Sequence, residues 1–182
     1  MAGKIYSSEE VEGHNVLIEW SIDVFSNLKA KLYSPNRKMV LATLCVLANM
    51  LASGYEYVKN FLRCHIDDCF YELYASLPNK HKRKMAVCVS NILYVKLDEE
   101  MMASVVHSGK ILECIEMMLG EEDDELSSEV MEIIERLLMM VEEWEEEGEL
   151  QWLTERMEAT GMMRRMEEVA AKKYGGFNWG DK

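Results

Sequence analysis

The stretch MAVCVSNILYV, residues 85–95, has a counterpart 42 positions earlier in ATLCVLANMLA, residues 42–52. Each is an apolar run with a cysteine three or four residues before a single asparagine, which is Asn91 in one run and Asn49 in the other. Apolar runs of this length without breaking residues favour helices packed among neighbours. One amide at the same place in both indicates two equivalent helices of a repeated unit.

The segments between these helices repeat as well. Three of them align: FLRCHIDDCFYELY (61–74), VVHSGKILECIEMM (105–118) and MEATGMMRRMEEV (157–169). Gly161 falls opposite Gly109 in this alignment, and His65 stands where those glycines stand. In the third helix of each unit, Asn49 aligns with Asn91 and more loosely with Arg136. A helical repeat of about forty residues predicts an α-solenoid, because one unit cannot cover its own apolar faces and stacked units can.

The chain of 182 residues has only 2 Pro and 10 Gly against 15 Met, a composition that favours helix. We find no segment with the two-residue period of a strand. We therefore predict an all-α fold with two full repeat units and a partial capping unit at each end. Its single repeat domain covers residues 16–174, between an N-terminal extension or cap at 1–15 and a flexible tail at 175–182.

At residue level the pattern resembles the armadillo-repeat superfamily. VVHSGKILECIEMML (105–119) resembles the first helix end, tight turn and second helix of an armadillo unit, and RKMAVCVSNIL (83–93) resembles its third helix. The resemblance covers roughly residues 16–170 and implies a right-handed α-solenoid of armadillo-like three-helix repeats. Within this superfamily the chain is most similar in style to importin-α nuclear-import adaptors. In those proteins a Trp four residues before each Asn lines a concave groove for a cargo peptide.

The chain departs from that family where the groove is built. The Trp position holds Cys45, Val87 and Glu132, and Arg136 replaces the third Asn. Residues 1–15 hold one Lys against three Glu, unlike a basic importin-β-binding segment. The resemblance thus implies a groove with amides that hold a peptide backbone but without indoles. A second, weaker resemblance, of GEEDDEL (120–126), is to the armadillo units of UCS-type myosin chaperones.

Charge is unevenly distributed within a net of −13. Residues 1–95 hold 11 Lys+Arg and 9 Asp+Glu, whereas residues 96–182 hold 9 and 24. Between Glu121 and Glu149, 14 residues are acidic and only Arg136 is basic. Such a surface opposes nucleic-acid binding and favours a protein segment rich in Lys or Arg, on which Trp144 would stack. The simpler interpretation is that these acidic residues form a solvated helix face.

The opposite charge is concentrated in one cluster, residues 80–84 (KHKRK), at the start of a predicted helix. Cations there oppose the helix dipole, which indicates a role such as binding an acidic partner, pairing with the acidic half of another copy, or nuclear localisation. The simpler interpretation is a polar helix start.

The five cysteines all lie in apolar helical patterns, and we expect them to be buried, free thiols of a cytoplasmic or nuclear protein. The residues CHIDDC (64–69) are the best metal candidate, but their spacing matches no common zinc pattern. The longest apolar run, 39–52, is too short to span a bilayer.

The sequence has no phosphate-binding loop and no nucleophile motif, so we predict no enzymatic activity, catalytic residue, metal or cofactor. We predict instead an adaptor or scaffold that binds a partner segment, with self-association as a further possibility and neither nucleic acid nor membrane as a partner. The alternatives are a divergent importin-α-like adaptor, a client-binding chaperone and a structural subunit of a larger complex. The predicted partner-binding residues are Asn49, Asn91, Glu132, Arg136, Glu142, Glu143 and Trp144.

Overall fold

The computed structural model describes residues 23–107, 110–144 and 148–174, and within these ranges every regular element is a helix. The predicted N-terminal extension at 1–15 and tail at 175–182 lie outside the described residues. Residues 23–32 form the first described helical segment. The helices that follow are α2 (Arg37–Leu51), α3 (Tyr55–Arg63), α4 (Ile66–Tyr74), α5 (Asn79–Leu93), α6 (Glu99–His107), α7 (Lys110–Leu119), α8 (Asp124–Glu143), α9 (Glu149–Ala159) and α10 (Met162–Tyr174).

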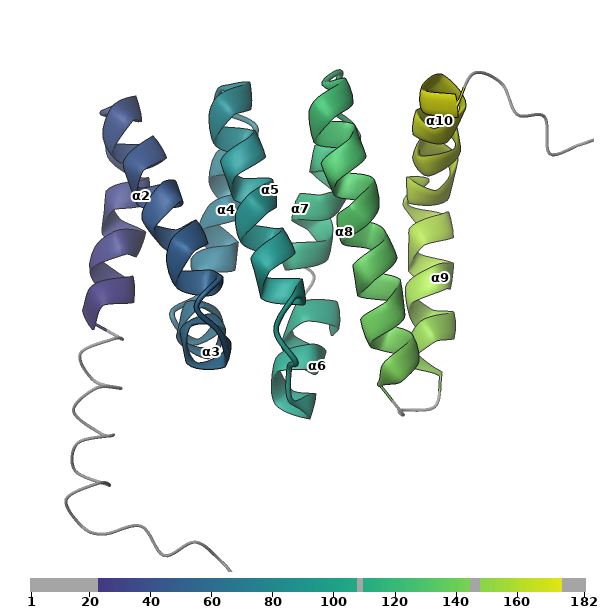
Figure 1. Cartoon of the computed structure of the whole chain (residues 1–182), viewed down its shortest axis with the longest axis horizontal. Helices are drawn as coiled ribbons and strands as arrows, with labels where there is room; N and C mark the ends of the chain where they lie inside the picture. The colour runs from purple at the N-terminus through teal and green to yellow at the C-terminus, as the bar shows by residue number, and fades with distance from the viewer. Residues whose placement is uncertain (1–22, 108–109, 145–147, 175–182) are drawn as a thin grey trace, which may run out of the picture.

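The helices form a repeating stack, which confirms the predicted all-α repeat fold. Two complete three-helix units, α3–α4–α5 and α6–α7–α8, stand between residues 23–32 with α2 on one side and α9 with α10 on the other. The third helices α2, α5 and α8 lie side by side across the front of Figure 1. The second helices α4 and α7 pack on each other behind them, and α3 contacts α6 below.

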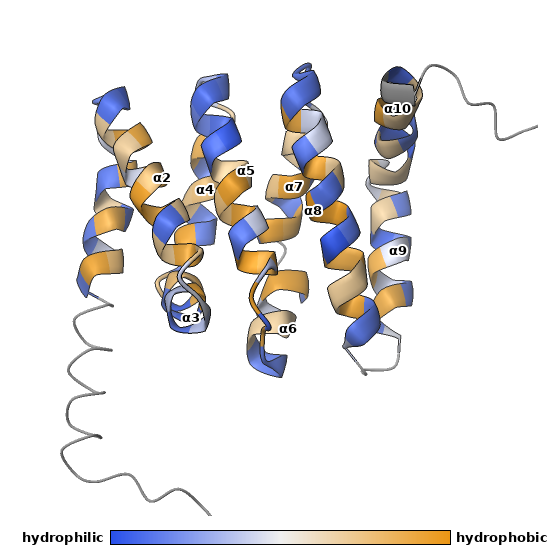
Figure 2. Cartoon of the chain, in the orientation of Figure 1, coloured by the Kyte–Doolittle hydropathy of each residue, from blue (hydrophilic) through white to orange (hydrophobic). Residues whose placement is uncertain are grey.

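The stack holds together through one continuous apolar core. Aliphatic and aromatic side chains from every described helix are buried in it, and Phe61 packs edge-on against Phe70 with ring centroids 5.4 Å apart. In Figure 2 each third helix is hydrophobic on some turns and hydrophilic on others, as expected when one side packs and the other meets solvent. Among the described helices, none is long and apolar enough to cross a membrane.

Local signals place the helix boundaries where the sequence predicts them. Asp98 accepts a hydrogen bond from the backbone N–H of Met101 at 2.9 Å and so caps α6. Between α3 and α4 the chain turns through His65, whose φ of 52° is left-handed, and Gly161 has a φ of 72° at the equivalent turn before α10. His65 thus adopts the left-handed backbone that Gly161 adopts at the aligned position.

The polar contacts between units link residues about one repeat apart. The imidazole Nε2 of His81 lies 2.8 Å from the carbonyl oxygen of Arg37, and the Cys88 thiol lies 3.6 Å from the carbonyl oxygen of Leu44, each pair 44 positions apart. The phenol of Tyr55 donates to the carboxylate of Asp98, 43 positions further on. These contacts fix the register in which each unit packs on the next.

Candidate functional site

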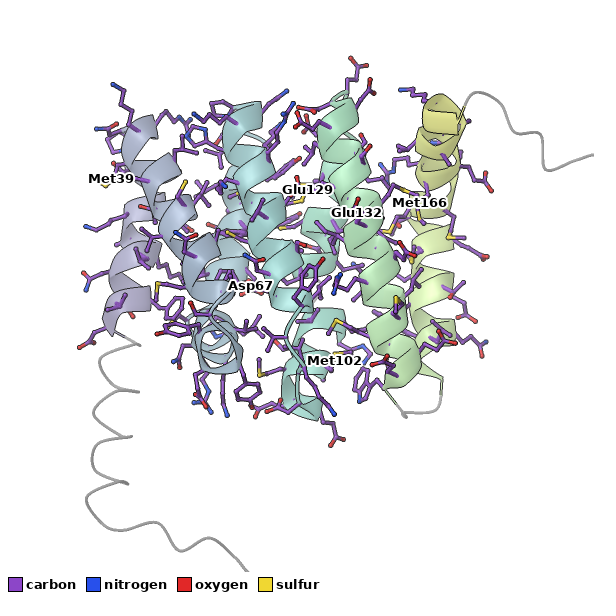
Figure 3. The ribbon with its side chains drawn as sticks, in the orientation of Figure 1. Met39, Asp67, Met102, Glu129, Glu132 and Met166 are labelled. Atoms are coloured by element: carbon purple, nitrogen blue, oxygen red, sulfur yellow. The ribbon has the colours of Figure 1, made fainter. Side chains whose placement is uncertain are left out.

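The solvent-exposed side of α2, α5 and α8, which we call the third-helix face, carries the predicted peptide-binding positions. At the three places where an import adaptor has Trp, Cys45 and Glu132 are exposed and Val87 is half-buried. Figure 3 shows Glu132 on the front of α8. The face is therefore open at these positions but lacks the indoles that would form troughs for lysine side chains.

The two asparagines of this face differ in what they contact. The side-chain amide of Asn91 donates a hydrogen bond to the carbonyl oxygen of Ala48 on α2, at 2.8 Å. Asn49 is exposed, and because α2 is the first described third helix, no earlier third helix lies beside it within the described residues. Asn91 thus joins two units, which leaves its amide oxygen and its second N–H available to a ligand, whereas Asn49 presents its whole amide to solvent.

Arg136 aligns with Asn49 and Asn91, and we call these three residues the asparagine row. Like Asn91, Arg136 contacts the preceding unit. The central carbon of its guanidinium lies 3.1 Å from the ring centroid of Tyr94 at the end of α5. A planar guanidinium at this distance lies against the ring face, where cation–π attraction holds it. Asn91 and Arg136 therefore make the same kind of contact by different chemistry, each with the helix one unit earlier.

A large hollow on the described surface lies beside this stacked pair. It has a volume of ≈ 880 Å³ and lies between the end of α5, the segment 94–98, the start of α6 and the second half of α8. Arg136, Glu143 and Trp144 line it, so the structure brings these three predicted residues together. Tyr94 and Met139 line it as well and are 62% and 55% exposed, more than the other exposed large apolar side chains described.

Trp144, which follows the last residue of α8, is half-buried and connects this hollow to a second one. The second hollow measures ≈ 640 Å³ and lies against α9, and Glu142 lines it together with Glu155 and Glu158. Glu142 therefore lies next to Trp144 but not in the first hollow. Glu132 and Asn49 line neither of the two.

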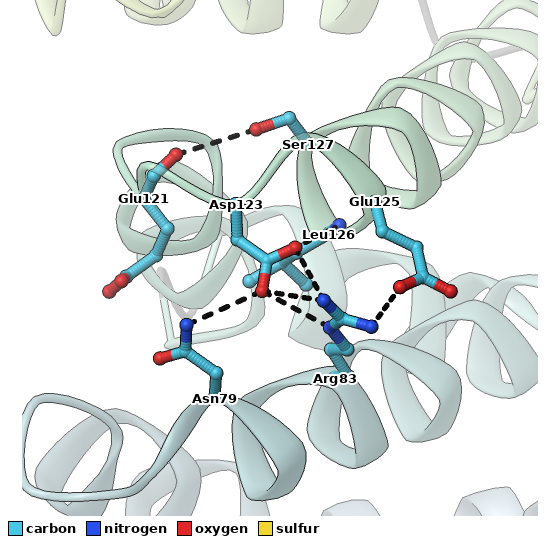
Figure 4. Close-up of polar contacts among 7 residues, drawn as sticks. All are labelled: Asn79, Arg83, Glu121, Asp123, Glu125, Leu126 and Ser127. Carbon is cyan, nitrogen blue, oxygen red and sulfur yellow. Dashed lines mark hydrogen bonds and ion pairs between the residues drawn. The ribbon is translucent and has the colours of Figure 1, made fainter.

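Two residues of the basic cluster at 80–84, Lys82 and Arg83, bind the acidic turn of the next unit in the same chain, and Figure 4 shows Arg83 there. Arg83 binds the carboxylate of Asp123 through two nitrogens, with the shortest distance 2.9 Å, and also binds Glu125. Lys82 is buried, with its Nζ 2.6 Å from Glu121 and 4.8 Å from the ring centroid of Tyr74. The unfavourable placement at a helix start is thus offset by an intramolecular partner.

Asp123 is the centre of this arrangement (Figure 4). It caps α8 by accepting a hydrogen bond from the backbone N–H of Leu126 at 3.0 Å, and the amide of Asn79 lies 3.4 Å from it. The hydrogen bond from Leu126 and the charge of Arg83 hold the pKa of its carboxyl below the usual range. The start of the acidic region is therefore a structural contact between units, and we assign no partner binding to it.

Further along α8, four acidic residues are free of ion pairs in the part of the chain that the structure describes. Glu132, Glu135, Glu142 and Glu143 are exposed, and none forms an ion pair within the described ranges. Burial raises the pKa of the Glu129 carboxyl, against the opposing charge of Lys84 on α5. Glu132, Glu135, Glu142 and Glu143 thus keep their negative charge available at the surface.

The cysteines are free, as expected, but the prediction that all five are buried is wrong. Cys45 is exposed and Cys64 is half-buried, while Cys69, Cys88 and Cys114 are buried. Cys45 precedes its asparagine by four residues and Cys88 by three. One residue is about 100° of helix rotation, so Cys45 meets solvent whereas Cys88 enters the core.

The candidate metal residues at 64–69 do not converge. His65 is exposed and lies 4.0 Å from Asp68, Cys69 is buried, and the described residues contain no group of three side chains able to hold a metal ion. Burial and the adjacent Asp68 raise the pKa of Asp67, which lies in the core beside Cys114. In this part of the chain the residues form a turn and a packed helix.

Sequence reasoning missed Tyr94 and Met139, the most exposed members of the large hollow. The signal was present, because each follows a member of the asparagine row by three residues: Tyr94 follows Asn91, and Met139 follows Arg136. Residues three apart on a helix lie on the same side. A bulky apolar side chain at that position in two successive units marks the same part of the third-helix face.

Comparison with known proteins supports the fold and gives no family. No protein-family model matches the chain, and no curated protein matches it. Two crystal structures of engineered proteins, Northeast Structural Genomics Consortium targets OR329 and OR366, are similar to it in three dimensions. The first has a TM-score of 0.51 and 15% identity, and the match covers 80% of this chain and 68% of that one. The second has a TM-score of 0.50 and 18% identity, and the match covers 81% of this chain and 69% of that one. At these identities the likeness concerns the helical fold alone.

Proposed function

We propose that the chain is a non-enzymatic protein-interaction module, an adaptor or scaffold of the armadillo type, that binds a segment of a partner protein along its third-helix face. The observation that carries the proposal is the large hollow between α5 and α8. It exposes Tyr94 and Met139 beside Arg136 and Trp144, which are the residue types enriched in the cores of protein interfaces.

The arrangement of units gives this face a shape suited to an elongated ligand. The exposed turns of α2, α5 and α8 succeed one another across the stack, with Asn49, Asn91 and Arg136 as one row. Exposed amides pair with the backbone of an extended peptide, because they both donate and accept hydrogen bonds. The acidic second half of α8 would attract a segment rich in Lys or Arg.

This function differs from that of an import adaptor in one physical respect. Cys45, Val87 and Glu132 offer no aromatic surface on which lysine side chains could lie. Affinity would instead come from apolar side chains seated at Tyr94 and Met139, with charge contributing mainly to the association rate. The free cysteines fit a protein that works in a reducing compartment, and we propose the cytoplasm or nucleus.

Site-specific photocrosslinking in cells of the source organism tests the proposal. A photoreactive phenylalanine replaces Tyr94 in one version and Tyr71 in another; Tyr71 is an exposed tyrosine on α4, outside the third-helix face. We expect a discrete set of protein adducts from position 94, identified by mass spectrometry, that is missing at position 71. Identical adducts at both positions, or none at position 94, would contradict the proposal.

A further inference from the structure

The large hollow beside Tyr94 has the size and lining of a pocket for a bulky apolar side chain. Its ≈ 880 Å³ falls within the range of about 300–1,000 Å³ typical of ligand pockets. Leu93, Leu97, Met102 and Met140 contribute apolar surface, and of these Leu93, Leu97 and Met102 are buried. A methyl or ring group entering it would therefore contact these apolar side chains.

The mouth of the hollow is formed by side chains that the fold leaves uncovered. Tyr94 and Met139 are more than half exposed, so large apolar areas meet water at this place. Arg136 lies on one ring face of Tyr94 and so restricts its rotation. Methionine adapts its shape to different apolar ligands, because it has three rotatable bonds and a polarizable sulfur. A fixed aromatic side and an adaptable methionine side together suit an inserted side chain.

The surroundings of the mouth are acidic. Glu99 and Glu143 line the hollow, and Glu100 and Glu142 lie next to them in sequence. The structure gives none of these four an ion pair in the part of the chain that it describes. Two cations also line the hollow, Lys96 and Arg136, and Arg136 is stacked on Tyr94. Two carboxylates and two cations thus line the hollow itself, and the acidic excess comes from Glu100 and Glu142 beside it, which basic side chains would complement.

From the apolar interior and the acidic mouth we infer that this hollow seats one bulky apolar side chain, Leu, Met or Phe, from a partner segment whose neighbouring residues are Lys or Arg. The inference deepens the proposed function and rests on it, since it names the chemistry of the segment and the place where its apolar residue binds. The seated side chain buries Tyr94 and Met139, and its basic neighbours lie against Glu99 and Glu143.

Three synthetic peptides of six residues test the inference. The first has a central Leu-Phe pair flanked by two Lys or Arg on each side, the second replaces Leu-Phe by Ser-Ser, and the third replaces the basic residues by Glu. We expect the first peptide to bind at least about tenfold more tightly than either of the others in fluorescence polarisation, because each control lacks one half of the complementarity. Equal binding of the Ser-Ser peptide would show that charge alone attracts it and would overturn the inference.

The place of binding is measured with the methionine methyl groups of the protein labelled with ¹³C. Titration of the first peptide should shift the NMR signals of Met102, Met139 and Met140 and leave those of Met39 and Met163 in place. Met39 is exposed at the outer side of α2 in Figure 3, away from the hollow. Shifts at Met39 without shifts at Met139 would place the peptide elsewhere and overturn the inference.

A pair of matched variants separates local from general effects. Met139→Lys and Met39→Lys each add one positive charge at an exposed methionine. We expect Met139→Lys to weaken binding of the first peptide about tenfold or more and Met39→Lys to change it less than about twofold, because only Met139 lines the hollow. Equal weakening by both variants would overturn the inference.

The two proposals fail in different ways. If photocrosslinking from position 94 captures specific partners but none of the peptides binds at Met139, the binding module stands and the chemistry inferred for its ligand is wrong. If position 94 yields no adducts, the proposed function itself is wrong.

Discussion

The side-chain amide of Asn91 donates a hydrogen bond to the backbone carbonyl oxygen of Ala48, 2.8 Å away, and so joins the third helices of two successive units. The same carbonyl also accepts the backbone N–H of Ala52 at 3.1 Å, at the end of α2. The amide of Asn91 thus uses the second lone pair of a carbonyl that already accepts a hydrogen bond in the last turn of α2. A residue that looks like a ligand-binding amide in the sequence contributes to the stack.

Removing this contact should destabilise the fold. We expect Asn91→Ala to lower the free energy of unfolding by about 1 kcal/mol, the usual contribution of an intramolecular hydrogen bond. Asn49→Ala is the matched control and should change it by less than about 0.5 kcal/mol, because Asn49 is exposed. Urea denaturation followed by circular dichroism measures both, and equal losses would mean that the amide of Asn91 does not hold the units together.

The basic cluster offers a second pair of variants. Lys82→Ala should cost about 2 kcal/mol, because it leaves Glu121 without its partner in a mostly buried contact. Lys80→Ala should change the free energy of unfolding by less than about 0.5 kcal/mol, since Lys80 is exposed. Thermal unfolding by calorimetry distinguishes the two. Equal stability of the two variants would show that Lys82 does not hold the units together, and a partner-binding role for the basic cluster would then be favoured.

Acid should weaken the contact at Asp123. Its carboxyl has a lowered pKa in the folded chain, first through the hydrogen bond from Leu126 and then through Arg83, so the folded state binds this proton less readily than the unfolded state does. The stabilisation is complete above about pH 4, the pKa of an unperturbed aspartate, and is lost as the pH falls through the lower folded value.

Asp123→Asn tests this pH dependence while keeping an acceptor that can cap α8. The variant should be less stable than the natural chain at neutral pH, and the difference should shrink as the pH is lowered from about 5 to about 2. Urea midpoints at several pH values measure it. A difference that is constant over that range would show that the charge of Asp123 is not its cause.

The thiols should react in an order set by exposure. Cys45 is exposed and should be alkylated first by iodoacetamide, whereas burial raises the pKa of Cys114 to about 12 and that of Cys88 further. Since the thiolate is the reacting form, Cys88 and Cys114 should be modified only after unfolding. Peptide mass spectrometry of partly labelled protein gives the order, and early modification of Cys88 would contradict the packing of α5 on α2.

The sequence predicted the fold well because its signals are local and repeated. Glycine and proline breaks, capping residues such as Asp98 and apolar periodicity define each helix without knowledge of its neighbours. The recurrence of these patterns then predicts that the units stack. The left-handed backbone of His65 was not predicted, although its alignment with glycine positions is a local signal for it.

The candidate site could be predicted only in part, because a surface depends on how units meet. Arg136 was identified by its position in the repeat, and Glu143 and Trp144 by charge and residue type, and the structure places all three around one hollow. The exposure of Tyr94 depends on the gap between α5 and α8, which no single helix pattern reveals. The partners of Lys82 and Arg83 likewise lie on the turn before α8, about one repeat further along the chain.

The contacts that join one unit to the next in the described stack link positions roughly 40 residues apart, as Asn91 with Ala48 and His81 with Arg37 do. A protein built in this way has low contact order, and proteins of low contact order fold fast. Folding can begin at any unit and spread to its neighbours, and unfolding can start at either end of the stack while the middle stays intact. Hydrogen exchange should therefore be slowest in α5 and α7, which have neighbours on both sides.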